Sequence, residues 1–142
     1  MLSTLGFEVQ TGLHTVTPYG RSGGSSRVRV FDWLDHLGLD AESHDYVGLA
    51  TNSPRVLGRH PWAIASAERD LRNLRHRVDS ATVLLSKQAS PFSQGAIEET
   101  LLRRASHGVY DFDDNLLEEQ NPGQLRSAFP KSRIWSRAVR SA

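Results

Sequence analysis

Along the 142-residue chain, segments in which hydrophobic residues are consecutive or occur at every second position alternate with segments in which they recur every three to four positions. Short apolar runs, or runs in which apolar and polar residues alternate, predict strands near residues 6–13, 42–47, 81–86 and 108–112. Stretches with apolar residues at helical spacing separate these strands. Because strands and helices alternate through short connections, we expect an α/β fold: a three-layer, Rossmann-like domain with a mainly parallel sheet.

The helical stretches have recognisable limits. The first begins near Arg27, with Ser25 or Ser26 as its N-cap, and is expected to end at Gly38. The second begins at Pro61, because proline suits the first turn of a helix. Four apolar sets are expected to face the core, the last of them in a helix from residue 130 or 131: Val30, Phe31, Leu34 and Leu37; Ile64, Ala67, Leu71, Leu74 and Val78; Ile97, Leu101, Leu102 and Ala105; and Ile134, Trp135, Ala138 and Val139.

The composition narrows the class of protein. Lys and Arg (17) nearly balance Asp and Glu (16), and a net charge of +1 favours no nucleic-acid partner. The absence of cysteine excludes a disulfide scaffold and any Cys-ligated metal site. No apolar run has membrane-spanning length, and the first residues, Met1–Leu5, lack the features of a signal peptide. We therefore expect a cytoplasmic protein.

A glycine-rich stretch, Gly20–Ser26, follows the first predicted strand and precedes a helix. In open α/β sheets ligands bind at the carboxyl ends of the strands, and glycines let the backbone approach a ligand closely. Amides at the start of the following helix can hold a phosphate or sugar oxygen. The spacing matches neither a P-loop nor the G-x-G-x-x-G fingerprint, and a mobile loop without a ligand is the alternative.

Three acidic residues, Asp111, Asp113 and Asp114, stand at the end of the last of these strands. Alternation along a strand places Asp111 and Asp113 on the same face, so that two carboxylates converge at the sheet edge. Such a cluster is costly unless it binds cations, caps a helix or faces solvent. The three acids are therefore candidate catalytic residues, with helix capping or simple exposure as the alternatives.

The histidines and tryptophans complete the candidate chemistry. His14 is expected just past the first strand, where an imidazole could act as a base or as a hydrogen-bond donor to a substrate. The other histidines have no spacing typical of a metal site and are interpreted as surface residues, so no metal site is expected. The tryptophans are expected in the core or in an interface. These remaining residues are His36, His44, His60, His76 and His107, and Trp33, Trp62 and Trp135.

Two parts of the chain together resemble one enzyme family. Gly23–Arg29, followed by an amphipathic helix, resembles the first loop and helix of bacterial glycosyltransferases that have the GT-B fold and are family-4-like (group 1). Val83–Lys87, the helix over Ile97–Arg104 and the V-Y-D-F-D-D sequence within Gly108–Leu116 resemble a later part of the same N-terminal domain. Asn115 stands where alanine is commoner in that signature.

This resemblance implies a two-domain enzyme that transfers a sugar from a nucleotide-sugar donor to an acceptor hydroxyl. Residues 1–142 would form a single N-terminal, acceptor-side domain, truncated before the C-terminal domain that binds most of the donor. The acceptor would be a small molecule, a glycan or a lipid. The implied substrate-binding residues are Gly23, Gly24, Ser25 and Arg27, to which we add His14, and Asp111, Asp113 and Asp114 would border the acceptor or the reaction centre.

The resemblance implies no cofactor. In this fold the departing diphosphate is usually stabilised without an essential metal, so Asp111 and Asp113 are not interpreted as a metal-binding D-x-D motif. Amides at a helix start would stabilise the diphosphate, and carboxylates would stabilise positive charge developing on the sugar. The chain on its own is expected to be inactive, to bind donors weakly and to self-associate through apolar residues that a second domain would cover.

Two other functions are open. A haloacid-dehalogenase-like phosphatase also has a strand that ends in D-x-D, in which Asp111 would be the nucleophile and Asp113 the acid/base. Against it, Asn115 replaces the usual threonine, and too little chain follows to supply the other motifs of that family. The third possibility is a non-catalytic binding module that keeps a Rossmann-like fold.

Overall fold

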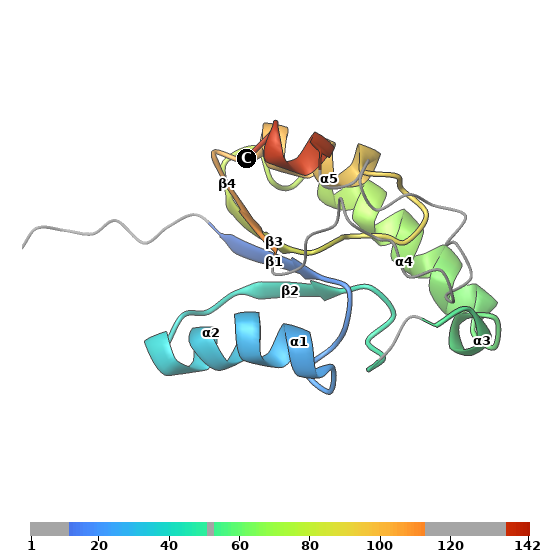
Figure 1. Cartoon of the computed structure of the whole chain (residues 1–142). Coiled ribbons are helices and arrows are strands. Elements are labelled where there is room, and N and C mark those ends of the chain that lie inside the picture. Colours follow the sequence, from blue (N-terminus) through green and yellow to red (C-terminus); the bar gives the residue numbers. More distant parts are fainter. Residues whose placement is uncertain (1–11, 51–52, 113–135) are drawn as a thin grey trace, which may run out of the picture.

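A parallel sheet forms the centre of the computed structural model, which describes residues 12–50, 53–112 and 136–142 (Figure 1). Its four strands lie in the order β2–β1–β3–β4, and every neighbouring pair runs parallel. The strands are β1 (Leu13–Thr17), β2 (Glu42–Asp45), β3 (Thr82–Ser86) and β4 (His107–Asp111).

Helices cover both faces of the sheet and complete three layers (Figure 1). One face carries a continuous helical segment after β1, and the other carries α4 and α5, with the short α3 preceding α4. A helical turn over residues 136–139 lies beside α5 (Figure 1). The elements are α1 (Gly24–Ser26), the π-helical turn η1 (Arg27–Phe31), α2 (Asp32–Leu37), α3 (Pro54–Leu57), α4 (Pro61–Leu74) and α5 (Ala96–Arg104).

The predicted α/β fold, a three-layer Rossmann-like domain with a parallel sheet, is confirmed. The second, third and fourth predicted strands lie at or beside their expected positions, whereas β1 comes later in the chain than residues 6–13. Residues 6–11 lie outside the described residues. β1 lies inside the sheet, between β2 and β3, and a strand covered on both faces needs no strict alternation of apolar and polar residues.

Strand alternation divides the core between the two faces of the sheet. Val16, Val83 and Leu85 pack with apolar residues of α4 and α5, and Ala138 of the last helical turn joins this larger cluster. On the opposite face Val30, Phe31 and Leu34 form a smaller cluster, packed against Leu13 and Leu84 of the sheet. Each fully buried side chain of this size contributes about 1.5–3 kcal/mol through loss of water contact.

Two apolar side chains expected to face the core, Leu37 and Val139, are exposed instead, and two tryptophans expected in the core or in an interface lie at the surface. Ile134 and Trp135, of the same expected set as Val139, lie outside the described residues. Leu37 and Trp33 are each 59% exposed on α2, and Trp62 is 87% exposed in the first turn of α4. Trp62 comes two residues before Ile64, and at 3.6 residues per turn it lies about 200° around the helix from the buried stripe. A single large apolar residue therefore did not indicate which face of the helix packs on the sheet.

The connections that follow β1 and β3 lead in opposite directions across the sheet. The helical segment after β1 lies on one face and leads outward to β2, while α5 after β3 lies on the other face and leads outward to β4. The loops that leave β1 and β3 therefore turn to opposite faces. In open α/β sheets this switch point, at the carboxyl ends of the strands, is where ligands bind.

Candidate functional site

Each strand ends in a polar residue, and these four residues form a row along the carboxyl edge of the sheet. The last residues are Asp45 in β2, Thr17 in β1, Ser86 in β3 and Asp111 in β4. Thr17 is in register with Asp45, and Ser86 is in register with Asp111. Thr17 and Ser86 are buried, and the row offers hydroxyl and carboxylate oxygens at this edge of the sheet.

Asp111 joins this row to the helical segment through an ion pair with Arg29. The Arg29 Nε donates to Asp111 Oδ2 at 2.8 Å, and a second guanidinium nitrogen donates to Oδ1. The Ser86 hydroxyl also donates to Asp111 Oδ2, at 3.0 Å. The Arg29 guanidinium, assisted by Ser86, lowers the pKa of the Asp111 carboxyl from its ordinary value although partial burial opposes this. Asp111 is therefore a paired carboxylate at neutral pH.

The glycine-rich loop lies at the same edge and is tightly folded. A Cβ added to Gly20 would lie 2.8 Å from both Asp45 Oδ2 and the Gly48 carbonyl oxygen. A Cβ added to Gly23 would lie 2.4 Å from the Cβ of Tyr19. Both positions therefore require glycine, whereas Gly24 has open space on its Cβ side. The close approach of the loop to the ends of β1 and β2 explains why the chain needs glycine here.

The helix that follows begins earlier than the sequence indicated. Gly23 is the N-cap, without a side-chain cap, so the prediction of Ser25 or Ser26 as N-cap is wrong. Instead, Ser26 is 1% exposed, and its hydroxyl has no hydrogen-bond partner within the part of the chain that the structure describes. Leaving a buried hydroxyl unpaired costs about 1–3 kcal/mol, so such groups commonly mark a site where a ligand or water completes the bonding.

The loop after β3 is strained at its first residue and held by hydrogen bonds. Lys87 has a φ of 63°, a left-handed conformation that non-glycine residues rarely adopt. Its amide donates to the Asp111 carbonyl oxygen at 2.8 Å, and its carbonyl accepts from the Tyr110 hydroxyl at 2.9 Å. Backbone strain of this kind concentrates at functional sites, where the surrounding structure maintains it.

Two glutamates from the helices fix the rest of this loop. Glu98 of α5 is fully buried, and its Oε1 accepts from the amides of Ala89 at 2.8 Å and Ser90 at 3.3 Å. Glu68 of α4 accepts from the hydroxyls of Ser90 and Tyr46. Burial and the neighbouring Glu68 carboxylate raise the pKa of the Tyr46 hydroxyl, so it stays a neutral donor. The loop is thus a preformed part of the carboxyl edge.

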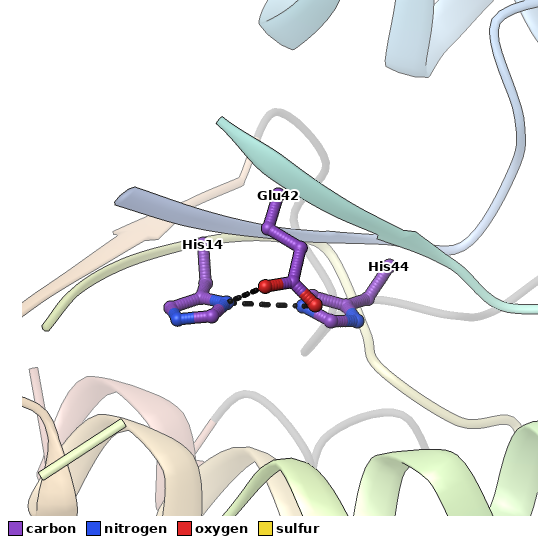
Figure 2. A group of neighbouring side chains, drawn as sticks. All are labelled: His14, Glu42 and His44. Carbon is purple, nitrogen blue, oxygen red and sulfur yellow. Dashed lines mark hydrogen bonds and ion pairs between the residues drawn. The ribbon is translucent and has the colours of Figure 1, made fainter. Parts of the chain in front are cut away.

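A second polar cluster lies on the opposite face of the sheet. His14 lies within β1 and not past its end, and with Glu42 and His44 of β2 it projects to the side of α4 and α5 (Figure 2). The His14 Nδ1 lies 3.1 Å from His44 Nε2. Glu42 Oε2 lies 3.7 Å from this His14 nitrogen, and Glu42 Oε1 lies 3.7 Å from this His44 nitrogen. Arg77 donates to Glu42 Oε2 at 2.6 Å.

The candidate residues named from the sequence thus separate into groups. Gly23, Gly24, Ser25 and Arg27 lie at the carboxyl edge with Asp111, and Arg27 is exposed to solvent there. His14 faces the other side of the sheet, away from this loop. Asp113 and Asp114 lie outside the described residues.

Sequence reasoning missed four residues that the structure brings to these sites. Arg29 and Ser86 hold Asp111 at the carboxyl edge, and Glu42 and His44 join His14. The spacing of Glu42 and His44 carried a usable signal, because residues two apart on a strand share one face. Arg29 carried none, since its contact with Asp111 spans 82 positions of sequence.

Comparison with family models, with curated proteins and with solved structures finds no match to this chain. In the described parts of the chain, no helix has the length and apolar character that crossing a membrane requires.

Proposed function

We propose that this chain is the acceptor-side domain of a glycosyltransferase, which moves a sugar from a nucleotide-sugar donor to an acceptor hydroxyl. The observation that carries the proposal is the ion pair between Arg29 and Asp111. This pair joins the two stretches that resemble the family, Gly23–Arg29 and Gly108–Leu116, at the carboxyl edge of a parallel sheet. Ligand binding at this edge is the rule for the fold class.

The helix start supplies the groups that a sugar diphosphate needs. The Gly23 amide donates to the Gly20 carbonyl at 2.9 Å, whereas Gly24 is exposed and offers its backbone amide at the positive end of a helical segment that runs to Leu37. Preorganised donors of this kind stabilise charge that develops on a departing diphosphate.

Asp111 acts in this proposal as a positioning residue for Arg29. Both of its carboxylate oxygens accept hydrogen bonds from Arg29, and one also accepts from Ser86. The carboxylate therefore fixes the guanidinium in one orientation at the carboxyl edge of the sheet, where an acceptor hydroxyl and donor phosphate would meet. The acceptor is a small molecule, a glycan or a lipid that offers a hydroxyl group.

The same contacts give no support to a phosphatase. A phosphatase of that type requires Asp111 to attack phosphorus with an accessible oxygen. Here a bidentate guanidinium and a hydroxyl engage the carboxylate and reduce its nucleophilicity. Sugar transfer by amide donors at the helix start makes no such demand on Asp111.

The test is binding of nucleotide sugars to the full 142-residue chain, followed by backbone amide NMR and calorimetry. A panel of UDP-, GDP- and dTDP-sugars is titrated, alone and together with simple glycoside acceptors. We expect weak binding, with no sub-micromolar site, and shifted amides confined to the glycine-rich loop, residues 24–29 and the loop after β3. Replacing Asp111 by Asn should weaken this binding about tenfold, since it removes a charge-assisted hydrogen bond.

Asp79→Asn is the matched control. Asp79 forms the same bidentate pair with an arginine, Arg104, but it lies before β3 at the opposite edge of the sheet. It should leave the binding unchanged. Shifts outside the carboxyl edge, equal effects of the two variants, or an absence of shifts with every member of the panel would each contradict the proposal.

A further inference from the structure

The His14–Glu42–His44 cluster has a geometry that the carboxyl edge and its proposed chemistry do not use. Cross-strand register places His14 of β1 opposite Glu42 of β2, and strand alternation brings His44 to the same face. One ligand atom from each residue lies within 4.8 Å of the others. Figure 2 shows the three side chains converging from two adjacent strands.

The separations within the cluster match those between ligands of one metal ion. Bonds of about 2.0–2.1 Å from a tetrahedral Zn²⁺ to nitrogen and oxygen place neighbouring ligand atoms about 3.4 Å apart. The observed separations are 3.1 Å between the two imidazole nitrogens, and 3.7 Å from each nitrogen to a different Glu42 oxygen. With a single Glu42 oxygen as ligand, all three atoms still lie within 4.8 Å of one another, so an ion could be bound after a side-chain adjustment of about 1 Å.

The hydrogen bond between the two imidazoles is compatible with metal binding. One ring nitrogen donates to the other in the metal-free protein, and that ring can free its lone pair by adopting its other tautomer.

The surroundings divide the cluster into a buried part and an accessible part. The His14 side chain is 7% exposed and that of His44 is 16% exposed, whereas the Glu42 side chain is 46% exposed. Arg77 holds one Glu42 oxygen, as residues behind the ligands do in metal sites, where they orient a ligating carboxylate. Solvent can reach the cluster on the Glu42 side and can supply a fourth ligand.

We propose that His14, Glu42 and His44 bind a divalent ion of the Zn²⁺ type, which links the edge strand β2 to β1. Two imidazoles and one carboxylate are typical ligands of zinc and of neighbouring transition metals. β2 is short, with four residues, and has a strand neighbour on one side within the described sheet. A metal bridge would hold this strand in register, and this role is independent of the proposed sugar transfer.

The experiment measures Zn²⁺ binding to the full chain without an affinity tag, by competition with a chromophoric chelator. Co²⁺ serves as a spectroscopic substitute, because its visible absorption reports coordination number and the presence of imidazole ligands. We expect one ion bound per chain, in a low-coordinate nitrogen and oxygen environment. Glu42→Gln and His44→Ala should each weaken binding about tenfold or more, and Arg77→Ala should have a smaller effect in the same direction.

The variants are chosen so that unfolding and loss of a ligand can be separated. The Glu42 side chain is 46% exposed and glutamine has nearly the same size, so Glu42→Gln should keep the fold, and circular dichroism checks this for each variant. His36→Ala is the matched control, because His36 is an exposed histidine on α2 outside the cluster. Stoichiometric binding that survives both Glu42→Gln and His44→Ala, equal weakening by His36→Ala, or no binding to the folded wild-type chain would overturn the proposal.

Discussion

At the scale of single residues, the carboxylate of Asp111 accepts two hydrogen bonds from Arg29 and one from Ser86. We expect Asp111→Asn to destabilise the chain by about 1–2 kcal/mol at pH 7, a value discounted because the pair is partly exposed. Urea unfolding measures the change. Asp79→Asn, whose partner Arg104 lies at the surface, should cost less.

The loss caused by Asp111→Asn should also depend on pH. The pKa of Asp111 is lowered in the folded chain, chiefly by Arg29, so its contribution to stability is complete above the unfolded-state pKa of about 3.9. That contribution is lost as the pH falls below this value towards the folded-state pKa. Unfolding curves of wild type and variant should therefore converge in acid, and a difference that persists undiminished there would exclude the ion pair as its cause.

Neighbouring glycines at the helix start should respond in opposite ways to alanine. Gly23→Ala places a Cβ against Tyr19 and should destabilise the chain by about 1–3 kcal/mol, as overpacking does. Gly24→Ala meets no atom within 4 Å and should stabilise it by about 0.4–1 kcal/mol, because it lowers the entropy of the unfolded chain. Chemical denaturation of both variants provides the measurement, and equal effects would show that the loop does not pack as described.

The candidate residues could be predicted only as far as local patterns allow. The glycine loop and Asp111 were found because loop and strand-end positions can be read from neighbouring residues. Glu42 and His44 have the two-residue spacing of one strand face, but their significance depends on His14 being opposite them in an adjacent strand. That register comes from packing between distant segments, and a single sequence does not report it.

At the scale of elements, the loop between β3 and α5 depends on one buried carboxylate. Glu98 accepts from the amides of Ala89 and Ser90 and from the Ser93 hydroxyl. Glu98→Ala removes all three bonds and should destabilise the chain by about 3 kcal/mol, while Glu98→Gln keeps an acceptor and should cost less.

Hydrogen exchange locates this effect within the element. The amides of Ala89 and Ser90 should lose protection in Glu98→Ala while the amides of β3 keep theirs. Glu99→Ala is the control, because Glu99 is the adjacent residue on α5 and its pairing with Arg103 at 3.7 Å is partly exposed. That variant should change stability by no more than about 0.5 kcal/mol. Unaltered exchange at Ala89 and Ser90 would mean that Glu98 does not hold the loop.

Whether a segment forms a helix or a strand was easier to predict than where it begins and which of its side chains are buried. The stripe Ile64, Ala67, Leu71 and Leu74 predicted both the existence of α4 and its buried side, because many residues agree on one direction. The start of β1 was misplaced, since a strand covered on both faces lacks the alternation that marks strand limits. Trp62 was expected in the core or in an interface, and its position on the helix, facing away from the stripe, excludes only the core.

At the scale of the whole molecule, the sheet separates two polar sites. The row of strand-end residues and Arg29 lie on the side of the α1–α2 segment, and the His14 cluster lies on the side of α4 and α5. The parallel arrangement of the strands followed from repeated β–α connections, which pack helices on both faces of a sheet, whereas the strand order β2–β1–β3–β4 is known from the structure alone. The fold class could therefore be predicted from pattern alone.

This separation predicts that the two sites contribute independently to stability. Glu42 and Asp111 lie on strands at opposite ends of the order β2–β1–β3–β4, so three strand spacings, about 14 Å, separate them. Glu42→Gln and Asp111→Asn should therefore destabilise the metal-free chain additively, within about 0.5 kcal/mol, in a double-mutant cycle by urea unfolding.

Arg29→Ala with Asp111→Asn is the contrasting cycle. Because these two residues are in direct contact, their coupling energy should reach about 1 kcal/mol. Glu42 and Asp111 share no hydrogen-bond partner among the described residues. A coupling energy between them as large as that between Arg29 and Asp111 would therefore mean that the sheet transmits strain between its faces.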